Sequence, residues 1–316
     1  MLNLQIFRPK LIKRNISGVL LLNKPSGISS HQALQIAKRI FSASKAGHTG
    51  TLDPMATGLL PVCFGEATKF SSVLLSADKT YEATLRLGYI STTGDSDGEI
   101  SVAGNVNLTL QQVESVLHNF IGKIMQTPPM YSALKHQGKP LYTYARKGIK
   151  IERQPREVTV YDLRVRTLEG DKMNITVKCS TGTYVRTLAE NIGRLLGCGG
   201  AYLTSLCRST INSFGLLDAY TLDMLEGMPL PQRDACLNPV DSLLHNLPAV
   251  FLDNVASVRL LQGRMVSGFT PADKLPERKK IRIYDREKRF LGLGEITACG
   301  EIIPKRLMVL ASTDPY

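Results

Sequence analysis

The hydrophobic pattern first predicts a buried strand and then an amphipathic helix. Residues 17–22 (SGVLLL) are mostly apolar, which predicts a buried strand, and residues 23–27 (NKPSG) predict a turn. Ser29 and Gln32 have the spacing of a capping box, which predicts that a helix begins there. The apolar residues that follow recur at helical spacing and predict one buried face: Ala33, Leu34, Ala37, Ile40 and Phe41.

Residues 80–88 (TYEATLRLG) alternate strictly between apolar and polar positions. A period of two residues is typical of a half-buried strand. The predicted buried face consists of Tyr81, Ala83, Leu85 and Leu87, and the opposite face of Glu82, Thr84 and Arg86.

Two more helices are predicted further along the chain. Thr109 and Gln112 form a second capping-box pattern. Its helix should bury Val113, Val116, Leu117, Phe120 and Ile121 and end at Gly122. Strand-like residues 173–179 (MNITVKC) lead into the other helix. That helix should bury Val185, Leu188, Ile192, Leu195 and Leu196 and end at Gly197.

The C-terminal pattern changes to short strands. Residues 230–239 (LPQRDACLNP) are loop-like, and a strand (AVFLD), a brief helix (NVASVRLL) and a hairpin (IRIYD to RFLGLGEI) follow. We therefore expect two domains, 1–247 and 248–316, the second small and β-rich. The order of elements predicts an α+β fold with a mixed, largely antiparallel sheet flanked by helices and loops.

The segment from about 123 to 153 differs from its surroundings. Prolines and glycines interrupt it, and three tyrosines lie among its basic residues, with Glu152 as the only acid. The basic residues are Lys123, Lys135, Lys139, Arg146, Lys147, Lys150 and Arg153. This mixture suits a surface that follows an RNA backbone and stacks on bases, although a solvated basic excursion fits the pattern nearly as well.

The composition is that of a folded protein, and its charge fits either an anionic partner or a merely soluble basic surface. The chain has 316 residues, of which 43% are hydrophobic and 21% charged. Its net charge of +12 favours a polyanion such as nucleic acid as partner. The six cysteines form no CxxC pair and the five histidines have no ligand spacing, so we expect reduced thiols and no metal site. We find no leader pattern in residues 1–14 and no run long enough to span a bilayer, and expect a cytoplasmic protein.

Residues 47–60 (GHTGTLDPMATGLL) hold one carboxylate in a constrained loop. An aspartate before a proline is usually a turn residue. However, Gly47 and Gly50 permit close backbone approach and Pro54 stiffens the chain, so the loop could also aim Asp53 at a ligand. His48 could contact a phosphate or a base, or hydrogen-bond within the turn.

Two other residues are candidates for the same site. Tyr81 begins the apolar face of its strand, where a ring can be a core residue or can stack on a planar base. Arg186 lies in the first turn of a predicted helix, where the helix dipole favours anions. A cation there is easier to understand with an acid beside it, and Asp53 is one possible partner.

The chain resembles the TruB family of tRNA pseudouridine synthases over nearly its whole length. The resemblance is carried by GHTGTLDPMATGLLPVCFGEATKF, LLNKPSGISS, DKTYEATLRLG, TPPMYSALKHQGKPLYTYARKG and CSTGTYVRTLAENIG. The C-terminal 248–316 is similar to a PUA-type RNA-binding module. One departure is that the family's Leu-Arg-Arg triplet appears here as Leu206-Cys207-Arg208.

The resemblance implies that uridine 55 in the tRNA T-loop is flipped out and isomerised to pseudouridine. It implies a monomer that needs no metal or organic cofactor. We also expect no membrane association and no obligatory protein partner. Asp53 would be the nucleophile and Arg186 its ion-pair partner. Tyr81 would stack on the uracil and is a candidate for removing the proton at C5. The resemblance assigns the remaining contacts to His48, Tyr184 and Leu206 around the flipped nucleotide, Lys24 and Pro25 as supports, and Lys69 at the RNA backbone.

This chemistry would explain a solitary acid, because an isomerisation needs no second carboxylate to activate water. Attack at C1′, attack at C6 and a glycal route all remain open. Two other functions also remain open. One is a non-catalytic protein that binds or folds tRNA, and the other is a related synthase that acts on other RNA such as rRNA.

Overall fold

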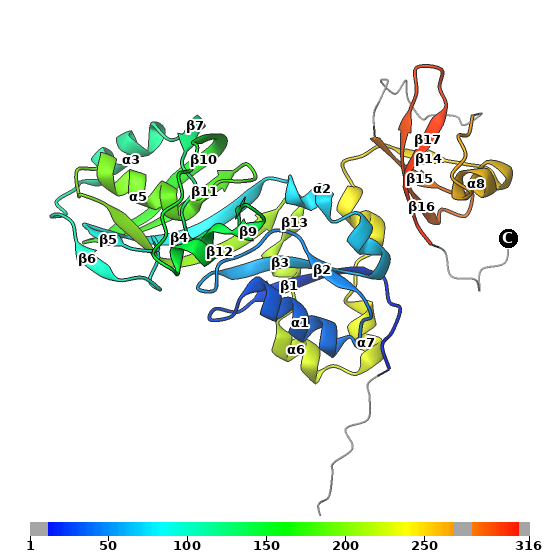
Figure 1. The fold of residues 1–316 in the computed structure, drawn as a ribbon, viewed down its shortest axis with the longest axis horizontal. Helices are drawn as coiled ribbons and strands as arrows, with labels where there is room; N and C mark the ends of the chain where they lie inside the picture. Colours follow the sequence, from blue (N-terminus) through cyan, green and yellow to red (C-terminus); the bar gives the residue numbers. More distant parts are fainter. Residues whose placement is uncertain (1–11, 268–279, 310–316) are drawn as a thin grey trace, which may run out of the picture.

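The structure, a computed structural model, describes residues 12–267 and 280–309. Figure 1 shows a larger part built on one long sheet and a smaller β-rich part beside it. Segments of the expected C-terminal domain, and most of the N-terminal stretch 1–14 in which we looked for a leader, lie outside the described residues.

A mixed sheet of nine strands runs through the larger part, within the described residues. Its strands are β1 (Gly18–Lys24), β2 (Ala46–His48), β3 (Thr57–Phe64), β4 (Lys79–Leu87), β7 (Gly122–Gln126), β10 (Arg156–Glu169), β11 (Lys172–Cys179), β12 (Ala201–Ile211) and β13 (Phe214–Gly215). Seven run in the order β1-β3-β12-β4-β11-β10-β7, with β2 on β3 and β13 on β12. All pairs are antiparallel except β3 with β12. The predicted α+β class with a largely antiparallel sheet is confirmed.

Strand β4 lies at the centre of this sheet and keeps the alternation that its sequence predicts. The four residues of its expected inner face are buried: Tyr81, Ala83, Leu85 and Leu87. In β1 the apolar run Val19–Leu22 is buried throughout, because helices cover the face of Leu20 and Leu22, and residues 67–74 and 240–244 pack on the face of Val19 and Leu21. Both strands hold site residues at or near one end, so a rigid core positions the site.

Helices pack against the two halves of the sheet (Figure 1). Their bounds are α1 (Ser30–Ile40), α6 (Leu222–Gly227) and α7 (Leu230–Ala235) beside β1–β3, and α3 (Leu110–His118) and α5 (Val185–Leu195) beside β10 and β12. The capping boxes predicted for α1 and α3 are both present. The expected buried face of α1 is also confirmed, because all five of its residues are buried.

Three predictions in the helical segments are wrong. Helix α3 ends at His118, so Ile121 lies in the turn after it and is exposed. Leu195, the last residue of α5, is also exposed, because the helix ends there and its side chain faces solvent. The segment 230–239 begins with helix α7 rather than a loop, since a proline in the first turn of a helix loses no hydrogen bond.

Short elements connect these layers. They are the 3₁₀ turns η1 (Gly65–Lys69), η2 (Leu216–Asp218) and η3 (Val240–Leu244), the short helix α2 (Ser72–Leu75), and the hairpin of β5 (Tyr89–Ser91) and β6 (Ile100–Val102). None of the helices in the described residues has the length and apolarity needed to cross a membrane.

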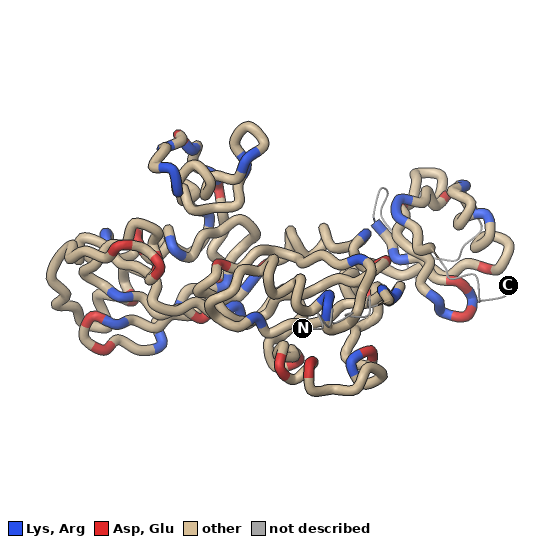
Figure 2. Tube along the Cα trace, turned by 60° about the horizontal axis from the view of Figure 1, so that its bottom comes forward, with Lys and Arg blue, Asp and Glu red and all other residues tan. Residues whose placement is uncertain are grey.

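The basic insertion starts later than its sequence suggests. Residues 122–126 form β7, the edge strand of the main sheet, so the segment that leaves the sheet is 127–155. It contains a hairpin of β8 (Lys135–His136) and β9 (Lys139–Pro140) and the short helix α4 (Leu141–Ala145). Figure 2 shows that the charged positions on the loop projecting from the body are mostly basic.

The smaller part has its own sheet and core. Its elements are β14 (Ala249–Phe251), α8 (Asn254–Leu261), β15 (Lys280–Tyr284), β16 (Phe290–Ile296) and β17 (Ile302–Leu307). The strand, helix and hairpin predicted after residue 248 are therefore present. Phe290 packs edge-on against Phe70, with ring centroids 5.4 Å apart, and so joins this part to the segment before α2.

Candidate active site

The loop that holds Asp53 is fixed by hydrogen bonds on both sides. Ser30 at the start of α1 accepts from the Leu52 amide at 2.8 Å and donates to the Leu52 carbonyl at 2.9 Å. Gly50 has φ +83°, which only glycine adopts without strain. With its backbone held next to Pro54, the loop loses little conformational entropy when Asp53 meets a ligand.

Lys24 is fully buried and contacts this loop from the end of β1. Its Nζ donates to the carbonyls of Pro25 and Ile28 at 2.7 Å each and to that of Pro54 at 3.3 Å. Burial lowers the pKa of Lys24 to about 8. Lys24 therefore ties the turn after β1 to the Asp53 loop through backbone carbonyls.

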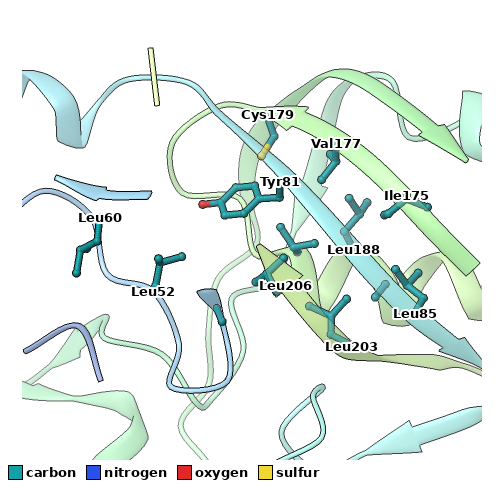
Figure 3. Close-up of a cluster of buried hydrophobic side chains, with 14 of the residues drawn as sticks. Leu52, Leu60, Tyr81, Leu85, Ile175, Val177, Cys179, Leu188, Leu203 and Leu206 are labelled. Carbon is teal, nitrogen blue, oxygen red and sulfur yellow. The ribbon is translucent and has the colours of Figure 1, made fainter. Parts of the chain in front are cut away.

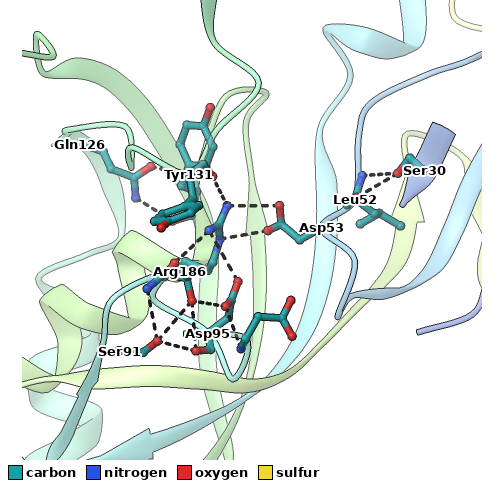
Figure 4. Close-up of polar contacts among 11 residues, drawn as sticks. Ser30, Leu52, Asp53, Ser91, Asp95, Gln126, Tyr131 and Arg186 are labelled. Atoms are coloured by element: carbon teal, nitrogen blue, oxygen red, sulfur yellow. Dashed lines mark hydrogen bonds and ion pairs between the residues drawn. The ribbon is translucent and has the colours of Figure 1, made fainter. Parts of the chain in front are cut away.

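Arg186 joins the Asp53 loop to the other half of the sheet (Figure 4). Its Nε lies 3.0 Å from one carboxylate oxygen of Asp53 and its Nη2 3.2 Å from the other. Nη1 donates to the Thr93 carbonyl at 2.9 Å, and Nη2 donates to the Tyr131 carbonyl at 2.7 Å. Asp95 contributes a second carboxylate 3.6 Å from Nη1.

These contacts decide the electrostatics of Asp53. Burial raises the pKa of the Asp53 carboxyl, the Arg186 guanidinium opposes this rise, and the negative charge of Asp95 adds to it. One third of the Asp53 side chain remains exposed, whereas those of Arg186 and Asp95 are each 5% exposed. Arg186 thus orients the Asp53 carboxylate, whose exposed part faces the pocket described below.

Tyr81 lies between the apolar core and that cavity. In Figure 3 its ring lies beside the core residues Cys179 and Leu206, and its hydroxyl points away from the aliphatic cluster. Burial raises the pKa of Tyr81, while the nearby Arg208 guanidinium lowers it. Arg208 is buried on β12 and donates to the Leu59 carbonyl at 2.8 Å and the Gly50 carbonyl at 3.0 Å.

A pocket of about 230 Å³ opens between the two halves of the main sheet. This volume lies just below the roughly 300–1,000 Å³ of ordinary small-molecule sites, so it suits one nucleobase-sized group. Five predicted site residues line it: Asp53, Tyr81, Tyr184, Arg186 and Leu206. The departure from the family triplet at Cys207 leaves Leu206 in this lining.

Four other predicted site residues do not line the pocket: Lys24, Pro25, His48 and Lys69. Pro25 is exposed and serves as an acceptor for Lys24. His48, on β2, is half-buried; burial lowers its pKa, and its Nδ1 has no hydrogen-bond partner among the described residues. Lys69 pairs with Glu66 at 2.6 Å and donates to the Leu307 carbonyl at 3.0 Å, which joins it to the smaller part.

Sequence reasoning missed several residues that shape the site. Asp95 reaches it from the loop between β5 and β6, and Arg208 from β12. Gln126, the last residue of β7, accepts from the Tyr184 amide at 2.7 Å and donates to its carbonyl at 3.0 Å. Of these residues, Arg208 alone was marked in the sequence, because it ends the Leu206-Cys207-Arg208 triplet that resembles the family's Leu-Arg-Arg.

Together the groups present one carboxylate, one guanidinium and one aromatic ring to a nucleobase-sized space. A carboxylate in this position can act as nucleophile or base, and the guanidinium can hold its charge and direction. All six cysteines are free, and no group of three potential metal ligands occurs among the described residues.

Comparison with protein families finds two matches. A model described as "TruB family pseudouridylate synthase (N terminal domain)" matches residues 38–185. A second, described as "Pseudouridine synthase II TruB, C-terminal", matches residues 248–308. The first range includes Asp53 and Tyr81 but ends one residue before Arg186.

Curated relatives match over nearly their full lengths. The chain is 62% identical to a tRNA pseudouridine synthase B of Nitrosospira multiformis over 94% of this chain and 96% of that protein. It is 54% identical to the tRNA pseudouridine synthase B of Nitrosomonas europaea over 92% and 95%.

Among solved structures, the fold resembles a chain of an H/ACA RNP bound to a substrate RNA containing 2′-deoxyuridine. The TM-score is 0.72 and the identity 23%, over 94% of this chain and 87% of that one. A chain of a Cbf5-Nop10-Gar1 complex matches with a TM-score of 0.71 and 25% identity, over 92% and 84%.

Proposed function

Because the chain belongs to the TruB family of pseudouridylate synthases, we propose that it acts on the T-loop uridine at tRNA position 55, with Asp53 as its catalytic group. The family membership fixes the reaction class: the enzyme isomerises uridine to pseudouridine in tRNA. The observation that best supports the role of Asp53 is its two-point contact with Arg186 at the wall of a nucleobase-sized pocket.

Asp53 acts in its ionised form. Arg186 favours that form against the opposing effect of burial, and it holds the carboxylate in one orientation. The carboxylate then attacks C1′ of the ribose or C6 of the uracil, or removes a ribose proton on a glycal route. Each of these routes begins with the same ionised oxygen, and none needs a second acid to activate water.

Tyr81 offsets part of the cost of taking the uridine out of its loop. Extruding a stacked base costs a few kcal/mol, and stacking on an aromatic side chain contributes about 1–3 kcal/mol per base. The Tyr81 ring lies at the pocket wall beside Leu206, where a flipped uracil can stack. Its hydroxyl, near Arg208, assists the removal of the C5 proton.

The rest of the chain binds the RNA. We assign residues 1–247 to a catalytic domain and 248–316 to a PUA-like RNA-binding domain, and the basic segment 127–155 to gripping the T-arm. Tyr184 contacts the flipped nucleotide from the pocket wall, and His48 contacts the RNA outside the pocket. Lys24 and Pro25 support the Asp53 loop. Lys69 could act at the RNA backbone only if its contact with Leu307 opens. The protein works as a monomer in the cytoplasm, where tRNA is available.

A T-arm hairpin tests this proposal against its two rivals. We expect the purified protein to form pseudouridine at the single uridine equivalent to position 55, and not in rRNA fragments of similar length. A protein that binds the hairpin without changing it would support a non-catalytic role in tRNA folding. Faster conversion of the rRNA fragments would place the enzyme among synthases for other RNA.

A further inference from the structure

Ser132 brings a buried hydroxyl without a hydrogen-bond partner to the pocket. Ser132 lines the pocket, its residue is 5% exposed, and its Oγ has no hydrogen-bond partner among the described residues. Other hydroxyls in the lining are paired: Thr181 donates to the Leu75 carbonyl at 2.7 Å, and Thr183 donates to the Ser180 carbonyl at 2.9 Å. Ser132 is therefore the lining hydroxyl that is both buried and unpaired.

The backbone around Ser132 is held firmly. The carbonyl of Tyr131 accepts from Arg186 at 2.7 Å, and the carbonyl of Ser132 itself accepts from the Tyr142 amide at 3.1 Å. The same guanidinium binds the carboxylate of Asp53, the proposed nucleophile. Ser132 and Asp53 therefore line the same pocket close to Arg186. Figure 4 shows Tyr131 and Asp53 meeting at Arg186.

A buried hydroxyl without a partner destabilises a folded protein, because it has lost its hydrogen bonds to water. Alanine at position 132 would remove that cost and keep the backbone contacts. A hydroxyl fixed at the wall of a substrate pocket, with both donor and acceptor capacity free, is instead suited to a ligand.

We propose that Ser132 is a substrate-contacting residue whose Oγ hydrogen-bonds an oxygen of the reacting uridine. This inference rests on the proposed function, since it takes that nucleotide as the occupant of the pocket. The oxygen belongs to a uracil carbonyl or to a ribose hydroxyl, both of which a serine hydroxyl can bind. The root of the basic insertion thereby contributes directly to the pocket and not only to the grip on RNA.

Ser132→Ala and a matched control test the proposal. Ser242 in η3 is also 5% exposed, also has an unpaired Oγ, and lies outside the pocket. Removing either hydroxyl should leave the Tm of the RNA-free protein unchanged or higher. Ser132→Ala should lower kcat/KM on the T-arm hairpin by about tenfold, the loss of one hydrogen bond to substrate, while Ser242→Ala should leave it unchanged.

Two results would overturn the proposal. One is a kcat/KM for Ser132→Ala within twofold of the wild-type value. The other is a clear fall in the Tm of Ser132→Ala without a fall in Ser242→Ala, which would indicate a structural hydroxyl. Failure of the proposed function would look different, because the wild-type protein itself would then make no pseudouridine.

A hairpin with 2′-deoxyuridine at the target position identifies the oxygen. If the wild-type and Ser132→Ala proteins bind this hairpin equally, but differ on the ordinary hairpin, the serine contacts the ribose 2′-hydroxyl. If the difference in affinity persists, the ligand is a uracil carbonyl or another ribose oxygen, and a 4-thiouridine hairpin then tests the O4 position.

Discussion

Arg186 carries one positive charge and faces two carboxylates, Asp53 and Asp95. The charge of Asp95 and the burial of Asp53 both favour protonation of Asp53, and Arg186 opposes them. The ionised form of Asp53, which the reaction needs, is therefore less favourable in the folded protein than in water. Strain of this kind is common where a fold serves catalysis at the expense of stability.

This arrangement predicts how Asp53→Asn changes stability with pH. A carboxyl whose pKa is raised by folding stabilises the folded state most below its unfolded pKa, and loses that contribution as pH rises through the folded pKa. Asparagine resembles the protonated acid and can still accept from Arg186. We therefore expect a higher Tm for Asp53→Asn than for wild type at pH 8, with the difference shrinking at pH 5.

Thermal melts of the two proteins at both pH values check this prediction. Asp162→Asn, which removes a surface ion pair with Arg164, serves as a control and should change the free energy of unfolding by less than about 0.5 kcal/mol. A lower Tm for Asp53→Asn at pH 8 would mean that the ion pair with Arg186 outweighs the burial of the carboxylate.

The basic insertion acts at the scale of an element. Lys135, Lys139 and Lys147 are exposed on or beside the β8–β9 hairpin and α4. If they contact phosphates, changing all three to glutamine should reduce the slope of log K against log [salt] by about 2–3, since each phosphate contact releases counterions. Binding of a T-arm hairpin between about 50 and 200 mM salt measures the slope.

Lys172→Gln is the control for this change. Lys172 begins β11, whereas the pocket is lined by the turn that follows the other end of that strand. Its replacement should leave the slope nearly unaltered. A triple variant with the wild-type slope would show that the insertion lysines do not touch RNA.

The elements that were predictable from sequence are those with a strong local signal. The capping boxes of α1 and α3 and the alternation of β4 each depend on residues within one turn or one strand. The errors arose where tertiary packing decides. Leu195 has the right residue type but faces solvent at the end of α5, and the proline-containing segment at Leu230 folds as a short helix.

At the scale of the whole molecule, the site forms only when distant segments meet. Asp53 and Arg186 were predictable individually from their motifs and their contact was a hypothesis, because 133 positions separate them in the chain. Asp95, Gln126 and Ser132 carry no local pattern that marks a site. Their positions follow from the tertiary structure, in which β4, β12 and the turn after β11 meet at one pocket.

The smaller part is joined to this framework through the segment between β3 and β4. Lys69 and Glu66 of η1 contact the backbone of Leu307 and Val309, and Phe70 packs on Phe290. Leu75, a few residues further on, lines the pocket and accepts hydrogen bonds from Lys79 and Thr181. One short segment thus touches both the C-terminal sheet and the pocket.

The most direct test of the central claim is to map pseudouridine in unmodified tRNA after incubation with wild type and Asp53→Asn, alongside the affinity of each protein for that tRNA. We predict pseudouridine at position 55 with wild type, a loss of at least about 10³-fold in rate with Asp53→Asn, and an affinity that the substitution leaves nearly unchanged. Conversion by Asp53→Asn at a rate close to wild type would contradict the assignment of Asp53 as the group that starts the reaction.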